Sequence, residues 1–336
     1  MNDGDFTKEA FDTKLQEAFL NLTLGKQPVF APVTYVLGGQ PGAGKTGLQN
    51  IMRKKCKGNL VILNGDEFRE LHPDFKRLQK KYGKDSVDYT GKFSGQMTEA
   101  LIAKLKEEKH NVLVEGTLRT AELPLKTCRE FKAAGYKVVL GVIAVKPQIS
   151  YLSTILRYEK MIAAGKTPRA TAKQNHDNTV KNIPDNLQQI FESKLFDNIL
   201  IYNRNGDCLY DMSKTPTISP STIIQEVFAN KWSQSELSQF VSIGNTAQEL
   251  MEQRNAPELA DFKDNVFNEK ILSSFPPKHF RALVTESELA KLKRSGIELV
   301  AIPDKKNNSG KYAIRVEAEL QEKVKALLGG SHSMKI

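Results

Sequence analysis

The chain has 336 residues, 40% of them hydrophobic and 26% charged, which is an ordinary composition for a globular protein. The length favours two domains, and no apolar run approaches the roughly 20 residues of a membrane-spanning helix. The formal net charge of +10 is scattered along the chain, so it favours small polyanionic ligands over nucleic acid.

The cysteines and the first residues of the chain bear on its location in the cell. Cys56, Cys128 and Cys208 are widely spaced and odd in number, so they predict neither a metal site nor a disulfide framework. Such usage suits a reducing compartment. The N-terminus lacks the apolar core of a signal peptide, and we therefore expect a cytoplasmic protein.

The first predicted elements are an amphipathic helix over residues 6–20, which we expect to be structural, and a buried strand over residues 34–37. Residues 39–46 then match the phosphate-loop pattern G-x-x-x-x-G-K-[ST] without a mismatch, and residues 48–55 suit a helix. The alternative is an ordinary glycine-rich turn. The coincidence of motif, preceding strand and following helix disfavours that alternative.

A phosphate loop requires these residue types for physical reasons. Glycine lets several backbone N–H groups turn toward one phosphate chain, and the following helix points its positive end at the same anion. We expect Lys45 to place a charge near the β- and γ-phosphates, and the Thr46 hydroxyl to ligate Mg²⁺. The predicted ATP-binding residues are Gly39, Gln40, Pro41, Gly42, Ala43, Gly44, Lys45, Thr46 and Gly47.

A second buried strand, over residues 60–63, ends shortly before Asp66. Ligands of open α/β sheets bind at the carboxyl ends of the strands. A carboxylate there can accept the proton of an attacking hydroxyl. The alternative is that Asp66 only caps the next helix, and spacing alone does not decide between the two. A helix is predicted over residues 97–105, where Glu99 lies off the apolar face and receives no role from the pattern.

A third strand, over residues 112–114, ends in Glu115, Gly116 and Thr117. In phosphate-loop proteins a carboxylate at this place holds Mg²⁺ through water or positions the substrate. The alternative is a strand-to-helix turn with a capping threonine. We favour the functional interpretation because the strand order places these residues beside the phosphate loop.

Two arginines follow a fourth strand over residues 138–145. Pro147 is expected to begin a helix that carries Arg157, and a loop then places Arg169 before a second helix. This arrangement is typical of the lid of small-molecule kinases, in which arginines neutralise charge on the transferring phosphoryl group. The alternative for either arginine is a surface salt bridge. His176, in the second helix, is expected to be structural.

The remaining pattern suggests a fifth strand, a returning hairpin strand and a further helix, followed by a different kind of region. The fold class predicted is α/β, with a phosphate-loop parallel sheet between flanking helices and a small α+β extension. The expected divisions are a kinase domain over 1–230 and an extension of unknown role over 231–336, helical over 233–272 and α+β over 278–328.

Short motifs at the strand ends and in the predicted lid form a specific combination. They are Gly38–Thr46, Asp66 with His72-Pro73, Met97-Thr98-Glu99-Ala100, Glu115-Gly116-Thr117 with Arg119-Thr120, Arg157-Tyr158-Glu159, Arg169-Ala170-Thr171, Lys173-Gln174, His176-Asp177, Val180-Lys181-Asn182 and Tyr202-Asn203-Arg204. Over roughly residues 6–228 the chain thereby resembles the zeta toxin family of bacterial toxin–antitoxin systems, the UDP-N-acetylglucosamine kinases.

That resemblance implies a nucleoside- or shikimate-kinase-like sheet and transfer of the ATP γ-phosphate to the 3′-hydroxyl of the amino sugar of UDP-N-acetylglucosamine. This activity would block the use of a cell-wall precursor. The resemblance further implies a small helical antitoxin that covers the ATP site. The implied catalytic residues are Asp66 as base, Lys45, Arg157 and Arg169. The residues expected to bind the sugar nucleotide are Asp66, Glu99, Glu115, Thr117, Arg119 and Thr127, with Glu115 also reaching Mg²⁺ through water.

Two other functions stay open on the residues alone. The same sheet and phosphate loop would serve a kinase of another hydroxyl, such as a nucleoside, an antibiotic or a polynucleotide end. A nucleotide-binding regulator that no longer transfers phosphate is the alternative outside enzymes. The joint presence of Lys45, Asp66, Arg157 and Arg169 argues against the regulator.

Overall fold

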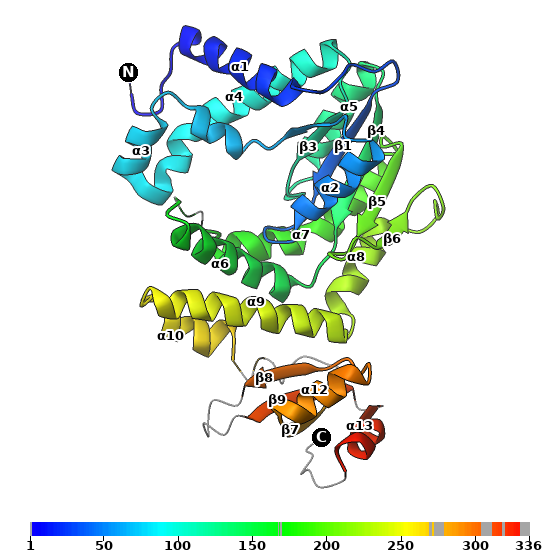
Figure 1. Ribbon diagram of the computed structural model, residues 1–336. Coiled ribbons are helices and arrows are strands. Elements are labelled where there is room, and N and C mark those ends of the chain that lie inside the picture. Colours follow the sequence, from blue (N-terminus) through cyan, green and yellow to red (C-terminus); the bar gives the residue numbers. More distant parts are fainter. Residues whose placement is uncertain are drawn as a thin grey trace. The chain divides into compact units, whose positions relative to one another are not determined.

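A computed structural model of the chain describes residues 2–166, 168, 170–268, 271, 279–303, 311–317 and 320–329. The chain divides into two compact units. Unit 1 contains residues 1–154 and 167–228, and unit 2 contains residues 155–166 and 229–336. Figure 1 shows the sheet and helices of each unit.

Among the described residues of unit 1, six strands form one sheet in the order β2-β3-β1-β4-β5-β6. The first five strands are parallel, and β6 runs antiparallel to β5 as the second arm of a hairpin. This confirms the predicted α/β fold class. The strands are β1 (Val33–Gly38), β2 (Val61–Leu63), β3 (Val112–Glu115), β4 (Lys137–Ile143), β5 (Asn198–Tyr202) and β6 (Cys208–Asp211).

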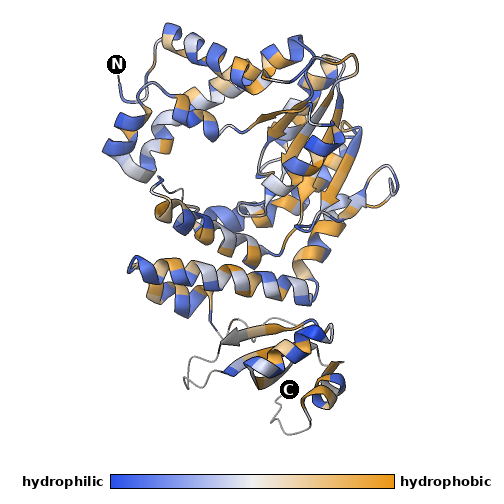
Figure 2. Ribbon diagram, viewed as in Figure 1, coloured by the Kyte–Doolittle hydropathy of each residue, from blue (hydrophilic) through white to orange (hydrophobic). Residues whose placement is uncertain are grey.

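Helices cover both faces of this sheet, because successive residues of each buried strand point to opposite sides. On one face Gly141 lies beside Leu37 and against the side chains of Leu48 and Met52 of α2. On the other face Val36, Leu140 and Val142 join a large apolar cluster with residues of α1, α4, α5, α7 and α8. Figure 2 shows the hydrophobic strands between helices of mixed hydropathy.

The helices of unit 1 begin and end close to the predicted positions, with one clear exception. The predicted helix over residues 97–105 is the last part of a much longer helix, α4, which starts at Ser86. The helices are α1 (Lys8–Thr23), α2 (Lys45–Lys55), η1 (Glu67–Leu71), α3 (Phe75–Tyr82), η2 (Gly83–Asp85), α4 (Ser86–Glu107), α5 (Glu122–Ala133), α6 (Pro147–Ala163), α7 (Lys173–Glu192) and α8 (Pro220–Ala229). Only the first half of α6, up to Thr154, belongs to unit 1.

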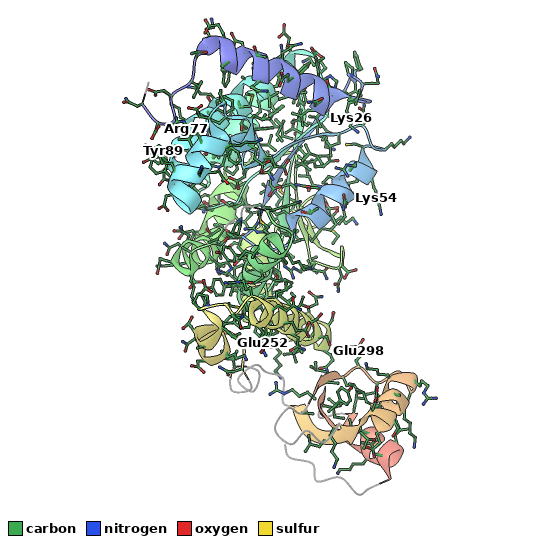
Figure 3. The ribbon with its side chains drawn as sticks, turned by 60° about the vertical axis from the view of Figure 1, so that its left-hand side comes forward. Lys26, Lys54, Arg77, Tyr89, Glu252 and Glu298 are labelled. Carbon is green, nitrogen blue, oxygen red and sulfur yellow. The ribbon has the colours of Figure 1, made fainter. Side chains whose placement is uncertain are left out.

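The segment before α1 is tied to α3 by charge. Asp3 accepts hydrogen bonds from Arg77 and Lys81 at 2.6 Å each and from the Tyr82 hydroxyl at 2.5 Å. These donors hold the pKa of Asp3 well below its usual range. Figure 3 labels Arg77 and Tyr89 in this region. These contacts give the segment before α1 a structural role, which is the role predicted for the helix that follows it.

Unit 2 joins the second half of α6 to two helices and a small α+β module. A three-stranded antiparallel sheet in the order β7-β9-β8 packs an apolar cluster against α12 and α13. Glu159 of α6 is 2% exposed and receives two hydrogen bonds from Arg254, at 2.7 and 2.8 Å. The elements are α9 (Gln234–Gln253), α10 (Leu259–Asp261), η3 (Phe262–Val266), β7 (His279–Thr285), α12 (Glu286–Arg294), β8 (Val300–Pro303), β9 (Lys311–Glu317) and α13 (Gln321–Leu328).

Candidate active site at the carboxyl edge of the sheet

The five parallel strands of unit 1 end at the same edge, and most of the predicted residues follow these ends. The phosphate loop follows β1, Asp66 follows β2, and Glu115 closes β3. A fourth feature, Arg204, follows β5 by two residues. This edge is where open parallel sheets bind their ligands.

Two glycines of the phosphate loop are required by their surroundings. Gly42 has φ of +75°, and a Cβ there would lie 2.0 Å from the backbone oxygen of Ser150 in α6. Gly39 has φ of +143°, and its Cβ would lie 2.7 Å from Ile143 Cγ2 at the end of β4. No other residue type fits either position, so the loop is packed directly on its neighbours.

The side chain of Gln40, predicted as an ATP-binding residue, lies inside the protein. It is fully buried, and its Nε2 donates to the backbone oxygen of Val145 at 2.8 Å. This bond fastens the start of the loop to the segment that follows β4, two residues after the strand ends. Any contact of Gln40 with a nucleotide would therefore come from its backbone.

Lys45 is the first residue of α2 and lies over the loop. Its Nζ donates to the Gly39 backbone oxygen at 3.2 Å and is 3.9 Å from Glu115 Oε1. Glu115 also accepts a hydrogen bond from Gln49 Nε2 of α2, at 2.5 Å. Burial raises the pKa of Glu115, and the Lys45 ammonium group opposes that rise. The structure thus brings the phosphate-loop lysine and the third-strand carboxylate together.

Arg204 belongs to the same site, although the sequence interpretation gave it no role. Its Nε donates to the Ala43 backbone oxygen at 3.0 Å, and its Nη2 donates to the Gly42 backbone oxygen and to Ser153 Oγ. Burial lowers its pKa. A signal existed in the sequence, because Arg204 stands three residues after the predicted fifth strand, residues 199–201, at the edge that carries the other candidates.

Asp66 lies at the start of η1 and is open to solvent. Its side chain makes no capping hydrogen bond, so the helix-cap alternative is wrong. The carboxylate is 64% exposed and accepts a hydrogen bond from Arg69 Nε at 3.2 Å. Its charge and that of Glu67 both contribute to the raised pKa of Glu115, so the three carboxylates share one region.

Four of the predicted substrate residues line one pocket beside β1 and β3. Glu115, Thr117, Arg119 and Thr127 all contribute to it, and Thr127 is buried. Thr117 does not cap the next helix, since α5 begins at Glu122 after Ala121. The strand-to-helix cap is therefore wrong for this threonine as well.

The turn that forms this pocket is held by an unusual residue. Leu118 has φ of +55°, a conformation that costs energy for a side chain other than glycine. Its buried side chain lies against Gly38, where a Cβ would be 2.2 Å from Leu118 Cδ1. Asn186 of α7 donates to the Leu118 backbone oxygen at 2.8 Å. The turn is thus fixed from two sides.

Glu99 lies on α4 and reaches toward α5. It is 70% exposed and pairs with Lys126 Nζ at 3.3 Å, next to the pocket residue Thr127. The structure therefore pairs Glu99 with the sequence neighbour of a pocket residue, and Glu99 itself does not line the pocket.

The two predicted lid arginines have different outcomes. Arg157 is exposed on α6, in the half that belongs to unit 2. Arg169 lies outside the described residues. His176, at the start of α7, is buried and contacts Ser150 Oγ through Nε2 at 2.8 Å and Asp177 Oδ1 through Nδ1 at 2.9 Å. Burial lowers its pKa.

The oxygen atoms suited to Mg²⁺ are few at this site. The described residues contain no group of three or more His, Cys, Asp or Glu side chains placed to hold a metal ion. Nucleotide-bound Mg²⁺ needs only one or two protein oxygens plus phosphates and water. The exposed hydroxyl of Thr46 and the carboxylate of Glu115 are hard oxygen donors and fit that requirement.

Comparison with known proteins identifies relatives over most of the chain. The Zeta toxin family model matches residues 21–215. Toxin PezT of Streptococcus pneumoniae is 45% identical over 233 residues, which cover 69% of this chain and 92% of that protein. Toxin zeta of Streptococcus agalactiae is 38% identical over 277 residues, covering 82% and 95%.

A solved structure gives the same result for the fold. The structure of the PezAT chromosomal toxin–antitoxin system of Streptococcus pneumoniae aligns with a TM-score of 0.69 and 41% identity, over 75% of this chain and all of that one. In the part of the chain that the structure describes, no helix is both long and apolar enough to cross a membrane. From these matches of sequence and structure, the chain belongs to the zeta toxin family, with a kinase-like fold built around a phosphate loop.

Proposed function

We propose that this protein is an ATP-dependent kinase that phosphorylates the 3′-hydroxyl of the N-acetylglucosamine unit of UDP-N-acetylglucosamine. One observation carries the proposal: a phosphate loop with its lysine, an exposed aspartate and a pocket lined by Glu115, Thr117, Arg119 and Thr127 share one edge of the sheet. Membership of the zeta toxin family supports the kinase class. The acceptor is inferred from the family resemblance of the motifs.

Each residue has a distinct task in this proposal. The loop N–H groups and Lys45 bind the β- and γ-phosphates. Asp66 accepts the proton of the acceptor hydroxyl, because its exposed carboxylate can be approached by the acceptor. Arg157 and Arg169 neutralise charge on the transferring phosphoryl group. The pocket residues and Glu99 hold the sugar nucleotide so that its hydroxyl lies in line with the γ-phosphate.

Mg²⁺ would be held by Thr46, and by Glu115 through water. When bound, it would neutralise charge on the phosphate oxygens. The short distance between Lys45 and Glu115 means that Lys45 must leave this carboxylate, or share it with the metal, when it turns to the phosphates.

The domain interpretation also stays a proposal: residues 1–230 for the kinase, 231–336 for an extension.

A substrate panel tests the acceptor. The purified protein is incubated with labelled ATP and Mg²⁺ and with UDP-N-acetylglucosamine, a nucleoside, an aminoglycoside or a DNA end, and the products are separated. We expect label only in the sugar nucleotide. Label in a nucleoside or in DNA, with the sugar nucleotide inert, would establish the other kinase class. Binding of ATP without any product under all metal conditions would favour the regulator.

We further propose a cytoplasmic location and a small helical antitoxin that covers the ATP site. The support is that the similar solved structure is described as part of a toxin–antitoxin system. The test is co-purification of this protein with the product of the neighbouring gene, followed by measurement of ATP binding. A complex that binds ATP as well as the free toxin does would contradict coverage of the ATP site.

A further inference from the structure

Arg204 contacts the outer side of the phosphate loop and not the side on which a nucleotide would bind. Its acceptors are the backbone oxygens of Gly42 and Ala43, which belong to consecutive peptide groups. It also donates to Ser153 Oγ of α6 at 2.8 Å. These partners all belong to unit 1, as Arg204 does.

The geometry of the peptide group links this contact to phosphate binding. In a trans peptide the C=O and the N–H of the same planar unit point in opposite directions. The Ala43 oxygen points at Arg204, so the N–H of Gly44 must point away from it. The N–H of Ala43, in the neighbouring peptide, is already used in a turn to the Gln40 oxygen at 3.1 Å. Gly44 is therefore the loop residue whose N–H Arg204 orients.

Without this cation the Ala43–Gly44 peptide would have little to hold it. Turning this peptide over changes ψ of Ala43 and φ of Gly44. Gly44, with φ of +96°, has no Cβ to oppose such a change, so the rotation would meet little resistance on that side. An ideal Cβ at Gly44 would lie 3.4 Å from Arg204 Nε, which shows how closely the guanidinium covers this peptide. The planar fork of arginine is suited to holding two acceptors at once.

The charge of Arg204 has a second effect. Among the described residues, its hydrogen-bond acceptors are two carbonyl oxygens and one hydroxyl, and no carboxylate neutralises it. Burial lowers its pKa, yet an arginine remains charged at any physiological pH. An uncompensated, half-buried cation behind the loop attracts phosphate through a medium that screens less than water does.

We propose that Arg204 is a positioning residue for nucleotide binding: it fixes the Ala43–Gly44 peptide so that the Gly44 N–H faces the phosphates, and it adds positive charge behind the loop. This inference deepens the proposed function and rests on it, because it assumes that the loop binds ATP. It does not assume which hydroxyl is the acceptor.

The test is calorimetric binding of ATP and of ADP to the unmodified protein, to Arg204→Gln and to Arg204→Lys, with melting temperatures measured alongside. Glutamine keeps one hydrogen bond without charge, and lysine keeps the charge without the fork. We expect ATP to bind about tenfold or more weakly to Arg204→Gln, with Arg204→Lys between the two. Arg53→Gln, which alters an exposed arginine of α2, is the matched control.

Steady-state kinetics separate a positioning role from a merely structural one. The KM for ATP should rise in both Arg204 variants while the KM for the acceptor stays constant. Equal ATP affinity for all folded variants, or equal rises in both KM values, would overturn the inference. If Arg204→Gln does not fold, the ATP affinity and the KM for ATP of the milder Arg204→Lys still test the inference. If the unmodified protein does not bind ATP, the proposed function itself fails.

Discussion

The two halves of the site differ in how their side chains are held. On the phosphate-loop side, buried or half-buried groups fasten the loop and its surroundings. Gln40 donates to Val145 just after β4, Arg204 donates to two loop oxygens, and His176 contacts Ser150, which packs against Gly42. On the acceptor side, the charged groups are open to solvent, with Asp66 at 64% and Glu99 at 70% exposure.

This difference separates what must be preorganised from what can adjust. Phosphate groups are the same in every nucleotide, so a loop that is fixed in advance binds them without a cost of ordering. The exposed carboxylates pair with nearby cations, Arg69 and Lys126, which they can exchange for a substrate. Changes on the loop side should therefore alter ATP binding or stability, and changes on the acceptor side should alter turnover or acceptor binding alone.

The largest effect is expected from Lys45→Ala, which removes the positive charge that Lys45 is proposed to place near the β- and γ-phosphates. Turnover should fall by about three orders of magnitude or more, and ATP should bind more weakly. Single-turnover kinetics and calorimetry measure the two quantities. The control is Lys54→Ala, on the last turn of α2, which Figure 3 labels and which is exposed. Near-normal turnover in Lys45→Ala would remove the phosphate-loop argument.

The next effect concerns Asp66→Asn on the acceptor side. The amide has nearly the same size but cannot take the hydroxyl proton, so turnover should fall by about two orders of magnitude or more. Melting temperature and the affinity for both nucleotides should stay unchanged, as in the control Asp12→Asn on α1. Weak binding of the sugar nucleotide at normal ATP affinity would instead make Asp66 a recognition residue. Full toxicity in cells at matched expression would exclude it as the base.

A smaller effect is expected from Thr127→Val, which removes a buried hydroxyl from the pocket and keeps the shape of the side chain. A lost hydrogen bond to the acceptor should raise its KM by about tenfold or less, with the KM for ATP unchanged. Initial-rate kinetics with each substrate varied in turn provide the measurement, with Thr13→Val on α1 as the control. A rise in the KM for ATP would show that the two halves of the site are not separate.

The smallest effect is a pH dependence on the loop side. Burial lowers the pKa of His176 below its ordinary value of 6.5, so the unfolded chain binds a proton there more readily than the folded chain does. The free energy of unfolding should therefore fall as the pH drops through about 6.5, by at most about 1.4 kcal/mol per pH unit. Urea unfolding at several pH values measures this free energy, and its slope against pH should be shallower for His176→Gln than for the unmodified protein. An equal slope in both proteins would mean that His176 does not contribute to the pH dependence.

Local sequence patterns were sufficient to predict most of the fold and one half of the site. The phosphate loop, the strand ends and the hairpin depend on residues close in sequence, and these predictions agree with the structure. The start of α4 at Ser86 could not be predicted in this way. Gly91 and Gly95 weaken the helix, and tertiary packing of buried residues such as Phe93 offsets that loss.

The groups that hold the loop were missed for a related reason. Arg204 acts across 161 residues of sequence, and its contact with Ala43 has no local signature. Gln40 was predicted only as a loop residue that binds ATP, because the motif does not reveal which side chains of the loop point inward. The roles of Asp66, Arg157, Arg169 and the pocket residues stay predictions, since they concern a bound substrate.

The pairing of Glu159 with Arg254 has a consequence for how the chain is made. Arg254 is synthesised 95 residues after Glu159. At about 5–20 residues per second, the carboxylate leaves the ribosome roughly 5 to 20 seconds before its partner. Burying a carboxylate without its partner is costly, so we expect Glu159 to become buried only after Arg254 has been synthesised. The packing around this part of α6, which also carries Arg157, should therefore be completed late in translation.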